Sequence, residues 1–244
     1  FEMKLLTRDR CCLSLLCLLG SLCVDESSLL IAADAPPFDV VIRNGKIVDG
    51  TGAPWYRADI GIRDGKIAAI GRLADQKTKK SIDATKLIVA PGFIDMMGQT
   101  ATPLMNDSDA AFNVLSQGIT TINCGEGVSA APQSDDDVAR TGWKTFGEYF
   151  LMLEQSGLPV NVVQTVGHTQ VRRLVIGDVD RRPTEAELEQ MKSHVQQAME
   201  DGAIGLSTAL IYPPAVYATT EEIAALAAVT GQSGGRYYTH MRNE

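Results

Sequence analysis

Four side chains that can bind a metal ion or a substrate lie at the ends of predicted β-strands. Cys124 and Glu126 follow one strand, His168 follows the next, and His240 lies in the last. Thiolates, carboxylates and imidazoles are the ligands that zinc takes in proteins. In a βα barrel the carboxyl ends of the strands meet at one face, where active sites gather. The residues therefore predict a site at that face.

The loop after the strand over 119–123 contains two candidate ligands. Glu126 lies between Gly125 and Gly127, which allow a close backbone approach, and a carboxylate binds zinc through oxygen. Its other interpretation is a loop carboxylate that caps a backbone amide. Cys124 is either a second candidate ligand or a small buried apolar residue. The residue types alone leave both open.

Two further residues, Tyr212 and Arg242, are candidates for substrate binding together with His168. Tyr212 precedes Pro213-Pro214, which stiffen the loop, so its phenol can face a substrate or pack against the rim. His168 is expected at the rim of the site, touching the substrate or supporting a residue that does. Arg242 lies two residues beyond His240 and can meet a substrate carboxylate or pair with Glu244.

The elements that must position these residues alternate between strand and helix from residue 93 onward. Two capping boxes, Thr184 with Glu187 and Thr219 with Glu222, begin predicted helices. This alternation predicts βα units and a parallel sheet. The expected strands are 93–96, 119–123, 160–166, 203–206 and 237–241, and helices are expected over 110–117 and 143–155.

A smaller β-unit is expected before these repeats, over residues 38–91. The run Ile42–Ile47 is echoed by Ile62–Ile67, and each contains a turn dipeptide, Asn44-Gly45 or Asp64-Gly65. Such dipeptides between apolar runs are strong signals for tight hairpins, because both turn positions need positive φ. Two hairpins are therefore predicted.

Composition excludes several classes of protein. The 244 residues are 45% hydrophobic and 21% charged, which is typical of a globular chain. The net charge of -8 does not suit a protein that binds nucleic acid or an anionic membrane. Residues 1–35 combine a basic start, an apolar run too short for a membrane span and small residues, as a secretory signal peptide does. Export is therefore expected, with no membrane attachment after cleavage.

Several separate motifs resemble the N-acyl-D-amino-acid deacylase (D-aminoacylase) family of the amidohydrolase superfamily. The resemblance covers about residues 38 to 244. Ala90–Asp95, between a hairpin-rich unit and βα repeats, is similar to the superfamily as a whole. The motifs that resemble the family are Ile47–Trp55, Gln117–Thr121, Gly205–Thr208, Ile211–Pro214 and Thr239–Glu244. The resemblance implies a β-sandwich, split across the two ends of the chain, around a (β/α)8 barrel. It also implies zinc and cleavage of an N-acyl-D-amino acid to a carboxylate and a D-amino acid.

The resemblance also assigns site residues, with one departure. It implies metal ligands at Glu126, counting back from Ser129, and at His240, and it places a substrate-side tyrosine at Tyr212. The family's His-x-His pair is replaced by Met97 and Gln99, which are not zinc ligands. One zinc ion per subunit is therefore expected rather than two.

Five βα strands are too few to close an eight-stranded barrel, so the chain is expected to be a truncated piece. The family's catalytic aspartate, the general base, would then lie beyond residue 244. The fold class expected is α/β: the N-terminal part of a small β-sandwich, then over 92–244 the first five units of an incomplete TIM-like barrel. Two other functions stay open: a cyclic-amide amidohydrolase of the dihydroorotase or hydantoinase kind, and a non-catalytic secreted relative that has lost its metal.

Overall fold

The computed structural model describes residues 36–243, which form two compact units, one ending at Val89 and the other beginning at Ala90. The predicted signal peptide, residues 1–35, lies outside the described residues. Within 36–243, no helix has the length and apolar character needed to cross a membrane.

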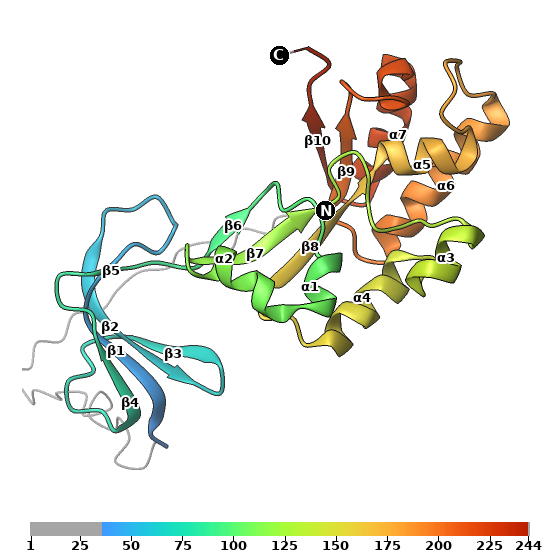
Figure 1. Cartoon of the computed structure of the whole chain (residues 1–244). Helices are drawn as coiled ribbons and strands as arrows, with labels where there is room; N and C mark the ends of the chain where they lie inside the picture. Colours follow the sequence, from blue (N-terminus) through green and yellow to red (C-terminus); the bar gives the residue numbers. More distant parts are fainter. Residues whose placement is uncertain (1–35, 244) are drawn as a thin grey trace, which may run out of the picture. The chain divides into compact units, whose positions relative to one another are not determined.

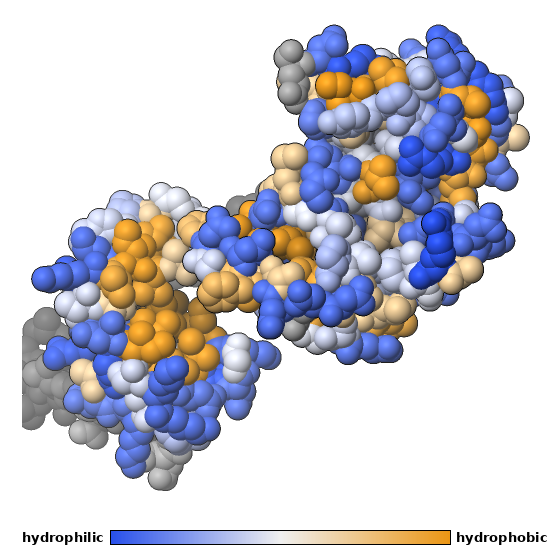
Figure 2. All heavy atoms as spheres, viewed as in Figure 1, coloured by the Kyte–Doolittle hydropathy of each residue, from blue (hydrophilic) through white to orange (hydrophobic). Residues whose placement is uncertain are grey.

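The first unit is a five-stranded sheet around a long central strand, β1 (Phe38–Ile47). β1 pairs antiparallel with β2 (Tyr56–Arg63) and parallel with β4 (Thr78–Asp83) and β5 (Ile88–Val89), while β3 (Lys66–Gly71) pairs antiparallel with β2. Its small core contains Phe38, Val41 and Leu73. Large apolar side chains remain exposed on this unit, and Figure 2 shows such residues gathered over it; they include Ile67, Ile70, Leu87 and Ile88.

One of the two predicted hairpins is wrong. Asp64-Gly65 does form the turn between β2 and β3, with positive φ at both residues. Asn44-Gly45 instead lies inside β1, where the register with β2 shifts between Ile42 and Gly45. Asn44 has φ 64°, and its backbone N–H donates to Asp59 Oδ1 at 2.8 Å. The dipeptide therefore forms a β-bulge in which Asn44 takes the positive φ that G1-type bulges share with tight hairpin turns.

The second unit is an α/β unit whose five parallel strands stand in chain order, β6 to β10 (Figure 1). Consecutive parallel strands joined by helices are the arrangement of a (β/α)8 barrel, here as an open five-stranded part of one. The strands are β6 (Phe93–Asp95), β7 (Ile119–Cys124), β8 (Asn161–Gly167), β9 (Gly205–Ala209) and β10 (Arg236–His240).

Helices α4, α6 and α7 lie along one side of this sheet in Figure 1 and bury its core with β7, β8 and β9. That core contains Phe146, Tyr149, Met191, Leu206 and Leu226, all of them at most 1% exposed. The helical segments are α1 (Thr102–Asn106), η2 (Ser108–Ala111), α2 (Phe112–Leu115), α3 (Asp135–Thr141), α4 (Phe146–Ser156), α5 (His168–Val175), α6 (Glu185–Glu200), η3 (Ala215–Tyr217) and α7 (Thr220–Gln232).

The two predicted capping boxes have different outcomes. At the start of α6, Thr184 accepts a hydrogen bond from the Glu187 amide, and the Glu187 side chain bonds back to Thr184, as predicted. At the start of α7, Thr219 accepts from the Glu222 amide at 3.3 Å, but the Glu222 carboxylate does not return the bond. It is buried against α5 instead, so the second box is half formed.

Candidate metal and substrate site

Glu126 lies in a tight loop after β7 that only glycine neighbours permit. Gly125 has φ +99° and Gly127 has φ +67°. A Cβ added to Gly127 would lie 2.6 Å from the Ala209 Cβ of β9, and one added to Gly125 would lie 2.3 Å from the Thr165 carbonyl of β8. The close approach expected from these glycines is therefore present, and it fixes where Glu126 projects.

Two buried hydroxyl groups hold this loop against the neighbouring strands. Ser207 Oγ of β9 accepts from the Gly127 amide at 3.1 Å and donates to the Gly125 carbonyl. Thr165 Oγ1 of β8 lies within hydrogen-bond distance of the carbonyls of Cys124 and Gly125, at 3.1 and 3.2 Å. Neither residue was expected from the sequence, because buried serine and threonine carry no distinct pattern.

Glu126 and His240 come together at the carboxyl ends of β7 and β10. The distance between Glu126 Oε1 and His240 Nδ1 is 3.3 Å, and both side chains keep about a fifth of their surface exposed. The other carboxylate oxygen, Oε2, accepts a hydrogen bond from Gln99 Nε2 at 3.1 Å. The two residues proposed as ligands therefore present an oxygen and a nitrogen donor to the same small volume.

Cys124, the other candidate in this loop, is directed into the core. Its side chain is 1% exposed and belongs to the apolar cluster of the second unit, and its Sγ donates a weak bond to the Gly98 carbonyl at 3.6 Å. Burial, and secondarily the nearby carboxylate of Asp95, raises the pKa of the thiol to about 12. Cys124 is not among the residues that line the cavity at the strand ends, whereas Glu126 is, which favours Glu126 as the candidate ligand in this loop.

An open cavity of about 570 Å³ lies over Glu126 and His240. Met97 and Gln99, which stand where the family's histidines are expected, both line it. Tyr212 also lines it, with its ring 6.1 Å from the His240 ring at an edge-on angle of 66°. Such a volume accommodates a small amino-acid derivative. Other lining residues include Thr100, Val128, Thr169, Arg173, Ala209 and Pro213.

The rim position expected for His168 is wrong. Its side chain is fully buried at the start of α5, and Nε2 lies 2.8 Å from Glu222 Oε1 of α7. Arg172, one turn later, donates from Nη1 to both Glu222 oxygens, at 2.8 and 2.6 Å. The first turn of α5 presents His168 to this buried carboxylate rather than to the cavity.

Arg242 does not line the cavity either. Its guanidinium donates to the carbonyl of Val216 and, at 3.0 Å, to that of Ala218. Arg242 therefore ties the chain after β10 to the segment around η3. The partner considered for it in the sequence, Glu244, lies outside the described residues.

The donor set fits zinc in kind but not in number. Zinc in proteins usually takes four ligands, three of them from the protein in catalytic sites. Over residues 36–243, no group of three histidine, cysteine, aspartate or glutamate side chains is placed to hold a metal ion. Glu126 and His240 thus supply two donors of the right type.

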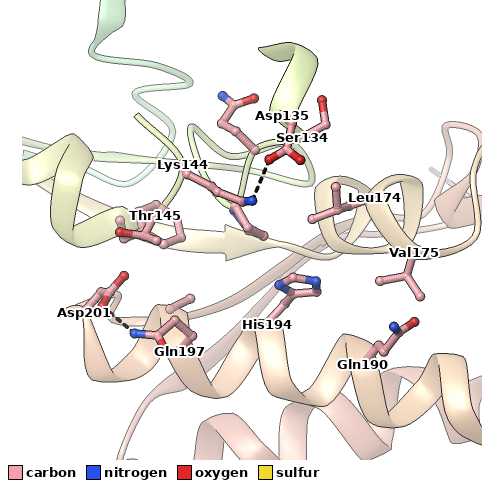
Figure 3. Close-up of a pocket in the computed structure, with 14 residues that line it drawn as sticks. Ser134, Asp135, Lys144, Thr145, Leu174, Val175, Gln190, His194, Gln197 and Asp201 are labelled. Carbon is pink, nitrogen blue, oxygen red and sulfur yellow. Dashed lines mark hydrogen bonds and ion pairs between the residues drawn. The ribbon is translucent and has the colours of Figure 1, made fainter. Parts of the chain in front are cut away.

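A second cavity, of about 520 Å³, lies among α3, α4, α5 and α6, away from the strand ends (Figure 3). Lys144 pairs with Asp135 at 2.6 Å at its edge, and Gln197 donates to Asp201 at 2.8 Å. The His194 ring points into the space, and burial, followed by the Lys144 charge, lowers its pKa. Since none of the predicted site residues lines this cavity, the candidate site is the one over Glu126.

Comparison with known proteins gives the same class of relatives at the levels of sequence and fold. The family described as urease alpha-subunit, N-terminal domain, matches residues 25–100. D-aminoacylase from Alcaligenes xylosoxydans xylosoxydans is 37% identical over 223 residues, covering 87% of this chain and 46% of the relative. The chain thus spans about half the length of the curated relatives it matches.

Solved structures agree with this result. N-acyl-D-glutamate deacylase from Bordetella bronchiseptica, in complex with zinc and a phosphonate inhibitor, is 38% identical, with a TM-score of 0.78 over 86% of this chain and 46% of that one. A D-aminoacylase described as having a binuclear metal centre is 35% identical, with a TM-score of 0.74 over 85% of this chain and 46% of that one. An L-hydantoinase from Arthrobacter aurescens, at 22% identity and a TM-score of 0.58, shares the fold alone.

The second unit shares its fold with solved amidohydrolases, among them N-acyl-D-glutamate deacylase and D-aminoacylase. In sequence the chain is similar to the N-acyl-D-amino-acid deacylases over most of its own length and over about half of theirs.

Proposed function

We propose that the protein hydrolyses the amide bond of N-acyl-D-amino acids, yielding a carboxylate and a free D-amino acid, with one bound zinc ion. The observation that carries the proposal is the meeting of Glu126 and His240 at the strand ends, in a chain whose relatives are N-acyl-D-amino-acid deacylases. Within residues 36–243, Glu126 and His240 are the two residues proposed as zinc ligands.

In this proposal Glu126 and His240 would hold zinc, one through a carboxylate oxygen and the other through an imidazole nitrogen. When bound there, the metal would supply Lewis-acid chemistry to the substrate amide and to the attacking water. Gln99 donates to Glu126 Oε2 and thereby orients the carboxylate. Tyr212 stands at the edge of the cavity, where its phenol contacts the substrate. Ser207 and Thr165 keep the Glu126 loop rigid.

A single ion is proposed because Met97 and Gln99 replace the pair of histidines that the family carries after its first barrel strand. A thioether and an amide are weak zinc ligands compared with imidazole. Export through the segment 1–35 is also part of the proposal. A non-catalytic relative remains the second candidate, since the same two replacements remove ligands.

The test compares three variants of the metal loop in the full-length protein. Glu126→Ala should lose both zinc and hydrolysis of N-acetyl-D-amino acids. Glu126→Cys should keep zinc, because a thiolate is also a good ligand. Cys124→Ala is the matched control from the same loop and should keep both, at a stability cost of at most about 1–2 kcal/mol.

Zinc content is measured after dialysis, together with circular dichroism to confirm folding. About one zinc per subunit is expected for the wild type, and two would contradict the single-ion proposal. Loss of zinc in Cys124→Ala, while Glu126→Ala stays folded and loaded, would move the ligand to Cys124. A wild-type protein that binds no zinc and hydrolyses no N-acyl-D-amino acid would favour the non-catalytic relative.

A further inference from the structure

Helix α5 carries two pairs of residues one turn apart, and the pairs face different surroundings. His168 and Arg172 are both fully buried against Glu222 of α7. Thr169 and Arg173, each one position further along, line the cavity that contains Glu126 and His240. Because residues i and i+4 share a helix face, the pair packed against Glu222 sets the direction of the pair that lines the cavity.

The same buried arginine also fixes the partner of Arg173. Arg172 Nη2 donates to the carbonyls of Val179 and Arg181, at 3.3 and 2.6 Å. These carbonyls lie in the segment that contains Asp178, and Asp178 Oδ1 accepts from Arg173 Nε at 2.8 Å. The Arg173 guanidinium is thus held from one side by a carboxylate whose own segment is anchored in the core.

Arg173 has its terminal nitrogens available to a ligand. Within residues 36–243 its hydrogen bond and ion pair both run through Nε, to Asp178, and neither Nη atom has a protein partner. The side chain is 44% exposed. Among the residues that line this cavity, Arg173 is the only arginine or lysine, while Glu126 brings a negative charge. Arg173 is therefore the permanently charged cationic side chain that an anionic ligand in this cavity can contact.

We propose that Arg173 binds a carboxylate of the N-acyl amino acid substrate and so determines which substrates the site accepts. This inference rests on the proposed function, because it places the substrate's amide at Glu126 and His240. A guanidinium with two free Nη groups matches a carboxylate in a two-bond geometry, which an ammonium group cannot reproduce. The carboxylate is either the α-carboxylate or that of an acidic side chain.

Binding is tested on the zinc-loaded full-length protein with ligands that cannot be hydrolysed. Three ligands are compared. N-methanesulfonyl-D-leucine carries only the α-carboxylate, N-methanesulfonyl-D-glutamate carries an α-carboxylate and a side-chain carboxylate, and N-methanesulfonyl-D-leucinamide carries no carboxylate. Dissociation constants are measured by calorimetry for the wild type, Arg173→Met and Arg173→Lys. Arg140→Met is the matched control, since Arg140 is also a helical, exposed arginine paired with an aspartate, Asp137, and lies outside the cavity.

Arg173→Met should weaken binding of the acids by about 10- to 100-fold, the range for loss of a charge-assisted contact, and leave the leucinamide unchanged. An equal loss for both acids identifies the α-carboxylate, and a loss confined to the glutamate ligand identifies the side chain. Arg173→Lys should recover part of the loss, and Arg140→Met should change nothing.

Three results would overturn the assignment: unchanged binding of both acids by Arg173→Met, an equal loss for the leucinamide, or a wild type that binds neither acid. Hydrolysis of the N-acetyl compounds is measured separately. Arg173-dependent binding without hydrolysis would refute the proposed function and leave the carboxylate site standing.

Discussion

Replacing Glu222 with glutamine should strongly destabilise the second unit. The carboxylate is 2% exposed, and it accepts from His168 and Arg172, which are both 0% exposed. Glutamine keeps the shape but removes the charge. Arg172 then remains buried with the carbonyls of Val179 and Arg181 as its acceptors.

The size of the effect follows from the cost of an unpaired buried charge. Breaking a buried ion pair by removing one partner costs about 3–5 kcal/mol. A typical domain has only about 5–15 kcal/mol of net stability. Replacing both partners, as in Glu222→Gln with Arg172→Met, should cost less than Glu222→Gln alone, because no buried charge is then left without its partner.

The assay is urea unfolding followed by the fluorescence of Trp143, which is 5% exposed in the core of the second unit. A Trp55→Phe background removes the signal of the other tryptophan, which belongs to the first unit. Glu221→Gln is the matched control, since Glu221 is the exposed neighbour in the same helical turn, and it should unfold almost as the wild type does. A Glu222→Gln variant with the same urea unfolding midpoint as the wild type would refute the reasoning.

The same carboxylate gives a pH dependence with a definite sign. Burial alone would raise the pKa of Glu222. Hydrogen bonds from His168 and Arg172 lower the pKa by more than burial raises it, so it lies below its usual value. A depressed pKa in the folded state adds stability above the unfolded value of about 4.3, and this stability is lost as pH falls through the folded pKa. Glu222→Gln should lack this part of the acid sensitivity.

Three smaller predictions concern single side chains. Cys124, with its pKa raised to about 12 by burial, should react with a thiol reagent only on unfolding; rapid labelling of the native protein would contradict its placement. The lowered pKa of His194 means that the unfolded state binds more protons below about pH 6.5, so stability should fall from there toward pH 5. Thermal melts of His194→Gln should show a shallower fall, and an unchanged slope would refute this. Thr184→Ala should lower the free energy of unfolding by about 1 kcal/mol in urea titrations, because it removes the α6 cap, whereas an unchanged midpoint would deny the cap any role.

Local sequence signals predicted much of the fold, because helix caps and apolar periodicity act within a few residues. They failed where a distant partner decides. Asn44-Gly45 suits a hairpin and a bulge equally, and the pairing with β2 selects the bulge. The strand predicted over 203–206 is displaced to Gly205–Ala209, since Ser207 and Thr208 are buried polar residues that apolar patterning does not mark.

For the site, strand-end position gave several candidates, and the family resemblance singled out Glu126 and His240 among them. The structure brings these two within 3.3 Å of each other, while their role as metal ligands stays a prediction. Strand-end position did not show which way the first turn of α5 faces, so His168 was expected at the rim, whereas it is buried. The deciding residue, Glu222, lies 54 residues after His168 and carried only the signature of a helix cap.

The strand order of the two units has a consequence for synthesis on the ribosome. In the second unit each strand from β7 to β10 pairs with the strand synthesised just before it. Each new βα unit can therefore pack against the existing sheet as soon as it leaves the ribosome, before later residues are made. In the first unit β1 must wait for β4, since Phe38 pairs with Thr78. The central strand of that sheet is therefore the one that stays longest without its parallel neighbours during translation.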